Sequence, residues 1–162
     1  MRERTKLSES YRLAIRCGLL MTLALVGFFF MMKAFGLEHN LELRALNIII
    51  LSSFVYAALK TYKKQKNGQL PYLSGISLGI STAAAGVFPF AVLVFLYITV
   101  VSPDFMLDIQ RREPFGEYLN PLVVTFTIIL EGMISGFIAS YASLQYLRPS
   151  HMDKPVEVIE YS

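Results

Sequence analysis

Long apolar stretches alternate with short polar segments along the whole chain. Residues 17–32, 45–59 and 67–103 contain no charged side chain, and residues 119–147 contain a single one, Glu131. A bilayer core about 30 Å thick is crossed by roughly 20 residues of α-helix, because each residue advances the helix by about 1.5 Å. The pattern therefore predicts four membrane-spanning helices.

Proline, glycine and asparagine indicate where these helices begin and end. Asn120 is a suitable N-cap, and Pro121 is tolerated at the first helical position. Asn67 and Gly68 indicate a turn between the second and third helices. Pro89 lies inside the third helix and should kink it, because its ring displaces the carbonyl one turn earlier. The expected helices cover residues 11–34, 41–62, 71–101 and 121–146.

The composition supports a single membrane domain. Hydrophobic residues make up 54% of the chain and charged residues 17%, below the roughly 25% of soluble domains. We expect an all-α, integral membrane four-helix bundle over residues 1–150, followed by a flexible cytoplasmic tail at residues 151–162. Between the third and fourth helices, the outer segment 102–120 is expected to be a short helix on the membrane surface or an ordered loop that caps the bundle.

The charges beside the spans predict the orientation. Positively charged loops stay on the cytoplasmic side of a membrane. With both termini inside, all but four of the 15 lysine and arginine residues are cytoplasmic. The four on the outer side are Lys33, Arg44, Arg111 and Arg112. We therefore expect a multi-pass protein of the bacterial inner (cytoplasmic) membrane, and nucleic acid is not an expected partner.

A cleaved signal peptide is the alternative interpretation of the first apolar stretch. A basic N-terminal segment precedes it, and Ala34-Phe35-Gly36 has the small-x-small pattern of a cleavage site. However, the apolar stretch is longer than that of a typical signal peptide, and Lys33 lies just before this site. These two features favour a retained helix.

Glu131 is the main candidate for chemistry. A carboxylate at this depth costs a few kcal/mol, so its side chain should face protein or water. It lies about ten residues, or roughly 15 Å, inside the outer end of its helix. The carbonyl of Ala85, freed by Pro89, falls at a similar depth. Three hydroxyl side chains are also near the midplane: Ser52, Ser53 and Thr82. The sequence thus predicts an intramembrane polar cluster.

Two interpretations of this cluster remain open. Glu131 could carry a proton or bind a cation in a site gated by the kinked helix. Alternatively, it is a neutral carboxylic acid that hydrogen-bonds neighbouring helices. The second interpretation is favoured, because transport sites usually contain more than one buried ionisable group.

Small residues recur at four-residue spacing in the last two helices. Such a pattern allows two helix backbones to approach closely. The third helix contains Gly75 and Gly79, with Gly86 further along, and the fourth contains Gly132 and Gly136. We expect these residues to pack the two helices against each other; a seam between copies of the chain is the alternative.

The loop before the third helix is rich in lysine. Lys60, Lys63, Lys64 and Lys66 could bind anionic lipid headgroups, at up to about 1 kcal/mol per basic residue, or could serve only to orient the chain. The single cysteine, Cys17, excludes an intrachain disulfide. No phosphate loop, nucleophile motif or metal-binding spacing is present. We therefore expect neither a metal, nor a cofactor, nor an enzymatic activity.

The stretch Leu59–Gly79, with the sequence LKTYKKQKNGQLPYLSGISLG, resembles the middle of a bacterial family of small four-span membrane proteins. This family is the domain of unknown function forty-one ninety-nine. The similar features are a basic loop ending at Gly68, an aromatic residue at Tyr72 and a small-residue helix through Gly79. The closing helix through Gly132 and Gly136 also agrees. The resemblance implies a four-span fold and carries no activity or site residues.

The leading functional hypothesis is a non-enzymatic accessory or assembly component of the inner membrane. It would associate with other copies of itself or with a partner in a membrane complex. The alternative is a small proton-coupled transporter that uses Glu131.

Overall fold

The computed structural model describes residues 2–36, 41–68, 70–112 and 115–147, which form helices without any strand. The expected tail, residues 151–162, lies outside the described residues. The elements in chain order are α1 (Arg2–Ala34), α2 (Leu41–Gln65), α3 (Tyr72–Leu96), the π-helical turn η1 (Tyr97–Val101), α4 (Pro103–Arg112), the 3-10 turn η2 (Gly116–Tyr118) and α5 (Pro121–Leu147).

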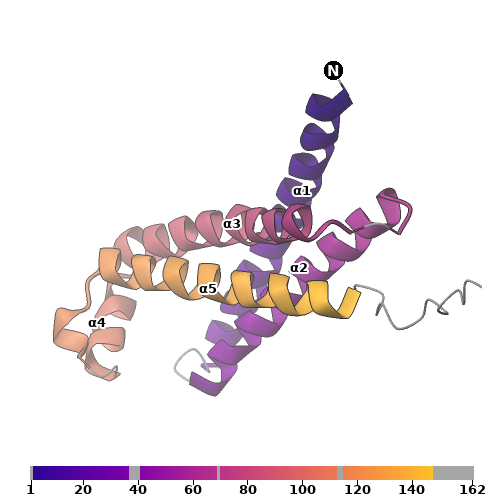
Figure 1. Ribbon diagram of the computed structural model, residues 1–162. Helices are drawn as coiled ribbons and strands as arrows, with labels where there is room; N and C mark the ends of the chain where they lie inside the picture. Colours follow the sequence, from indigo (N-terminus) through magenta and orange to yellow (C-terminus); the bar gives the residue numbers. More distant parts are fainter. Residues whose placement is uncertain (1, 37–40, 69, 113–114, 148–162) are drawn as a thin grey trace, which may run out of the picture.

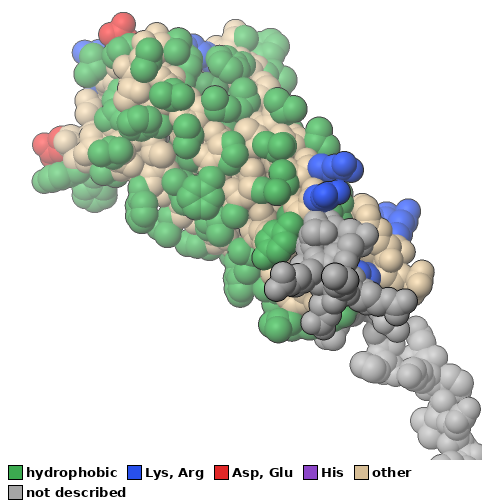
Figure 2. Space-filling model, turned by 90° about the horizontal axis from the view of Figure 1, so that it is seen from above, with side chains coloured by type: hydrophobic (Ala, Val, Ile, Leu, Met, Phe, Trp, Pro, Cys, Tyr) green, Lys and Arg blue, Asp and Glu red, His purple; other side chains and the backbone are tan. Residues whose placement is uncertain are grey.

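Four segments are long and apolar enough to cross a membrane. They are Ser10–Ala34 in α1, Ala45–Gln65 in α2, Tyr72–Val101 in α3 and η1, and Pro121–Leu147 in α5. Apolar side chains cover most of the face shown in Figure 2, and charged side chains are confined to its two ends. The predicted all-α membrane bundle is confirmed, and the chain is a multi-pass membrane protein.

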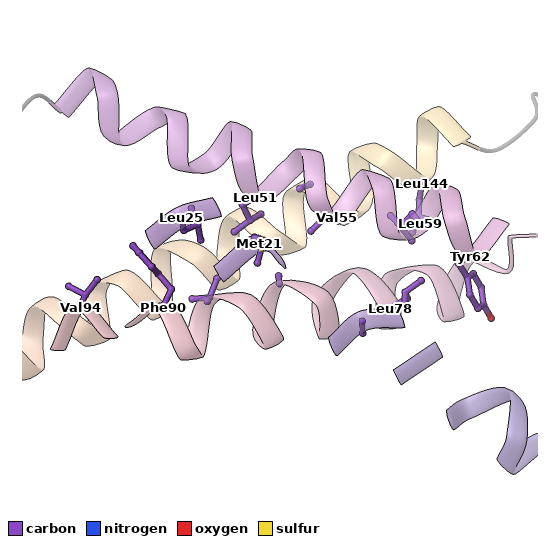
Figure 3. Packing of buried hydrophobic residues seen from close by; sticks show 14 of the residues in the cluster. Met21, Leu25, Leu51, Val55, Leu59, Tyr62, Leu78, Phe90, Val94 and Leu144 are labelled. Carbon is purple, nitrogen blue, oxygen red and sulfur yellow. The ribbon is translucent and has the colours of Figure 1, made fainter. Parts of the chain in front are cut away.

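Helix α3 has the two most extensive contacts among the spans, one with α5 and one with α1, and it also contacts α2. Figure 1 shows α3 and α5 running side by side, with α1 and α2 crossing this pair obliquely. The interior between them is apolar. Figure 3 shows Met21 of α1, Leu51 and Val55 of α2, Phe90 of α3 and Leu144 of α5 directed into it.

Local signals in the sequence account for two of the connections. Asn120 Oδ1 accepts a hydrogen bond of 2.9 Å from the backbone N–H of Val123, which confirms the predicted cap of α5. Asn67 and Gly68 have φ values of 52° and 86°, in the left-handed region that ends helices. The N–H of Gly68 donates to the carbonyl of Lys63 at 3.0 Å, so the predicted turn after α2 is also confirmed.

The segment between the third and fourth spans is folded onto the bundle. After Tyr97 the helix widens into η1, where the N–H of Ser102 donates to the carbonyl of Tyr97 at 2.9 Å. In α4, Met106 is buried in the apolar interior. Gln110 Nε2 then donates to the carbonyl of Leu119 at 2.7 Å. The described part of the segment is thus helical and packs on the end of the bundle, and its position on a membrane surface stays a prediction.

The expected orientation leads to a labelling prediction. In a Cys17→Ala background, a cysteine at the exposed Lys64 should react with a membrane-impermeant maleimide only after the cells are opened. A cysteine at the exposed Asp104 should react in intact cells, because it is expected on the opposite side. Labelling of the Lys64→Cys variant in intact cells would overturn the orientation.

Candidate functional site

Glu131 lies on the exposed side of α5. The buried side of this helix is formed by Gly136, Ala139 and Ser140, which pack against neighbouring helices. At about 100° per residue, Glu131 lies roughly 140° around the helix from the centre of the line of small residues at 132, 136 and 140. The small residues therefore direct Glu131 away from α3. Glu131 also takes part in an interaction within the molecule.

The hydroxyl groups expected beside Glu131 have other environments. Thr82 is fully buried and donates to the carbonyl of Leu78 at 2.8 Å. Ser53 is exposed and donates to the carbonyl of Ile49 at 2.8 Å. Ser52 is half-buried. The structure thus places a buried threonine on α3 and an exposed carboxyl group on α5, and the polar cluster around Glu131 stays a prediction.

A polar contact in the interior instead joins α1 to α3. The buried hydroxyl group of Thr22 lies 3.1 Å from the carbonyl oxygen of Gly18 and 3.0 Å from that of Gly86. Gly86 directly follows Ala85. The carbonyl of Ala85 receives no helical hydrogen bond, because Pro89, four residues later, has no backbone N–H. The half-buried Pro89 therefore lies in the part of α3 that meets α1. Gly18 and Thr22 are themselves four residues apart, a small-residue signal that the sequence analysis did not use.

Four of the predicted packing glycines lie between α3 and α5. A Cβ atom on Gly132 would lie 2.6 Å from Val87 Cγ2, and one on Gly79 would lie 2.7 Å from Ser140 Cβ. Real Cβ atoms do not approach other atoms this closely. At these glycines, the backbone of one helix therefore packs directly against a side chain of the other. Gly75 faces Leu144, and Gly136 faces Ala83.

Gly86 has a different role from the other packing glycines. A Cβ atom there would meet the Met21 side chain and would lie 2.9 Å from the carbonyl oxygen of Gly18. Gly86 therefore packs α3 against α1. The small residues of α3 follow two sides of the helix, one for each neighbour.

One of the lysines expected at the lipid headgroups stabilises the fold. Lys63 Nζ donates to the carbonyl of Leu147, the last residue of α5, at 2.7 Å. An ammonium group is favourable there, because the last carbonyls of a helix have no helical donor and carry partial negative charge. Lys60 and Lys66 lie over the rings of Tyr56 and Tyr62, at 5.8 and 5.6 Å from the centroids, and Lys64 is exposed.

An aromatic cluster at the other end of the bundle was not predicted. Tyr97 of η1 makes edge contacts with Phe29 of α1 and Phe105 of α4, with centroids 5.3 and 6.0 Å apart. Lys33 Nζ lies 4.4 Å from the centre of the Tyr97 ring. This contact partly offsets the cost of a lysine beside the apolar interior. The run Phe28-Phe29-Phe30 shortly before Lys33 was the available signal.

The described side chains contain no group of three His, Cys, Asp or Glu residues able to hold a metal ion. Asn47 Oδ1 is buried and has no hydrogen-bond partner among these residues, so a water molecule could occupy this position. The one acidic group at membrane depth, Glu131, can donate or accept hydrogen bonds on the outside of the bundle.

The model of one protein family, described as "Protein of unknown function (DUF4199)", matches residues 16–143. The match covers all four spans except the first residues of α1 and the last residues of α5. No curated protein and no solved structure gives a significant match. The family description assigns no activity, so it adds no site residues. Because the match extends over most of the chain, the protein belongs to this family of unknown function.

Proposed function

We propose that the protein is a non-enzymatic accessory or assembly component of the bacterial inner membrane, and that it acts by binding membrane protein through the exposed side of α5. The observation that carries this proposal is the exposure of α5. In its most apolar 18-residue window, 11% of the residues are buried, against 28%, 28% and 39% in the other three spans.

The energetic argument rests on how helices associate in a membrane. Lipid tails are as apolar as the exposed side chains of α5, so packing and interhelical hydrogen bonds drive association. Thr127 and Glu131 place polar groups on this exposed side. Interhelical hydrogen bonds in membranes contribute about 0.6 kcal/mol on average and up to about 1.7 kcal/mol.

Proton-coupled transport is the alternative function. It is supported by a titratable side chain at membrane depth, the feature that proton carriers require. The position of Glu131 favours association over transport, because a carrier needs a path within the protein and this side chain points out of the bundle.

Glu131→Gln tests the choice between these functions. We expect this variant to retain cellular function and stability, because an amide of similar shape still donates and accepts hydrogen bonds. The measurement is growth, or transport, in cells that express the variant and the wild type at the same level. Loss of function with normal folding would favour the proton carrier, because an amide cannot titrate.

A further inference from the structure

The end of the bundle where α2 and α5 finish is rich in lysine. Lys63 Nζ donates to the carbonyl of Leu147, which places the last turn of α5 beside the last turn of α2. Among the described side chains, the acidic ones lie elsewhere: those of α4 and η2 are at the opposite end, and Glu131 is inside α5. On the face seen in Figure 2, acidic side chains are likewise visible at one end only. The charge at the lysine-rich end therefore favours an anionic partner.

Two of these lysines form an exposed pair on one side of α2. Lys60 and Lys64 are four residues apart, so their side chains leave the helix in nearly the same direction. Lys63 is engaged with the end of α5 instead. Lys66 follows the end of α2, and its ammonium group lies over the ring of Tyr62. The pair of Lys60 and Lys64 can therefore hold one anionic group between two ammonium groups.

We propose that Lys60 and Lys64 bind the phosphate group of an anionic phospholipid whose acyl chains lie against α2. The spanning part of α2 ends at Gln65, so both ammonium groups are at the depth of the lipid headgroups. Lipid phosphate is the anion present at this depth. The inference does not depend on the proposed function, because it holds whether or not α5 binds a protein.

The side chains around this pair also suit a phospholipid. Lys60 Nζ lies 5.8 Å from the centre of the Tyr56 ring, whose centroid is 6.1 Å from that of the exposed Tyr146 ring on α5. Tyrosine rings are typical of the boundary between headgroups and acyl chains. At about 100° per residue, the exposed Ala57 and Ser53 lie on the same side of α2 as the pair, nearer the bilayer centre. Their short side chains leave room for an acyl chain below the bound phosphate.

A tryptophan beside the pair can report which lipid lies there, because the chain has no tryptophan of its own. The Tyr146→Trp variant is reconstituted in phosphatidylcholine vesicles that contain either phosphatidylglycerol or phosphatidylcholine with brominated acyl chains. Bromine quenches tryptophan fluorescence on contact, so the quenching curves give the relative binding constant of the two lipids. We expect a preference of roughly 25-fold for phosphatidylglycerol, since each basic residue at a membrane surface contributes about five-fold.

Substitutions of the lysines in this Tyr146→Trp background test the pair itself. Replacing Lys60 and Lys64 with glutamine should remove the preference, and replacing both with arginine should retain it. Lys66→Gln is the matched control, because it removes the same charge from the same end of the bundle but from a different side. It should leave the preference nearly unchanged. An equal loss in the Lys66→Gln and Lys60→Gln variants would indicate a general positive field and would overturn the site.

A second reporter decides the question even if the glutamine variants fail to fold. Tyr118→Trp lies in η2 at the other end of the bundle, where the tyrosine is 72% exposed. The two brominated lipids should quench it almost equally. A preference for phosphatidylglycerol that is the same at both reporters, or absent from both, would overturn the inference. Reversal of the quenching at Tyr146→Trp by soluble glycerol phosphate would identify a soluble phosphate ester as the ligand, and would overturn the lipid site as well.

Discussion

Replacing Gly136 with leucine is expected to separate α3 from α5 and to lower the unfolding temperature of the detergent-solubilised protein. Gly136 is buried, and even a single methyl group there would meet Ala83 Cβ. Leucine adds three further carbon atoms to this contact. Overpacking in a filled interior costs about 1–3 kcal/mol and occasionally more. The measurement is size-exclusion chromatography of samples heated to a series of temperatures. The variant should aggregate at a lower temperature than the wild type.

Gly27→Leu is the matched control for this experiment. Gly27 is also in a spanning helix, but it is exposed and a Cβ atom there would have no other atom within 4 Å. The same change of side chain should leave the unfolding temperature nearly unchanged. Ile129→Leu on α5 should be nearly silent as well, because it conserves volume. Equal unfolding temperatures for the Gly136→Leu and Gly27→Leu variants would contradict a close contact between α3 and α5.

The main elements of the fold could be predicted because each depends on a local signal. Uncharged stretches of spanning length produce the long helices, and Asn120 and Asn67-Gly68 produce the expected cap and turn. The close approach of a neighbouring helix to α5 also follows from local spacing, because Gly132 and Gly136 lie on one side of that helix. Signals of this kind need no knowledge of how the helices are placed relative to one another.

The side of α5 on which Glu131 lies could also have been derived from the sequence. Depth along the helix was used to group Glu131 with Thr82 and Ser53, but depth does not determine which side of a helix a residue occupies. Since Gly132 and Gly136 face α3, the turn of the helix directs Glu131 outward. A helical projection centred on the glycines would have shown this.

Other contacts could not be derived from local pattern. The hydrogen bond from Lys63 to Leu147 joins residues 84 positions apart, and the stacking of Lys33 on Tyr97 joins two different helices. Both depend on where helix ends come together in space. The contact of Gly86 with α1 is of the same kind, because a glycine on α3 does not indicate which neighbour approaches it.

Gly18→Ala is expected to destabilise the packing of α1 against α3, although it adds only one methyl group. At Gly18 the new Cβ atom would lie 2.9 Å from the Ala85 carbonyl carbon and 3.0 Å from the Gly86 nitrogen. These are backbone atoms inside a helix, and they cannot move aside as the end of a flexible side chain can. Separating the two helices would also lengthen the hydrogen bond from Thr22 to Gly86, now 3.0 Å.

Gly27→Ala is the control on the same helix, where the methyl group meets no other atom within 4 Å. Alanine favours a helix over glycine by about 0.8–1.0 kcal/mol in water, so the substitution on its own is not destabilising. A lower unfolding temperature for the Gly18→Ala variant, with none for the Gly27→Ala variant, would therefore measure the cost of the α1–α3 contact. Equal stability of both variants and the wild type would contradict the close contact between α1 and α3. It would also contradict the hydrogen bond from Thr22 to Gly86, which requires that contact.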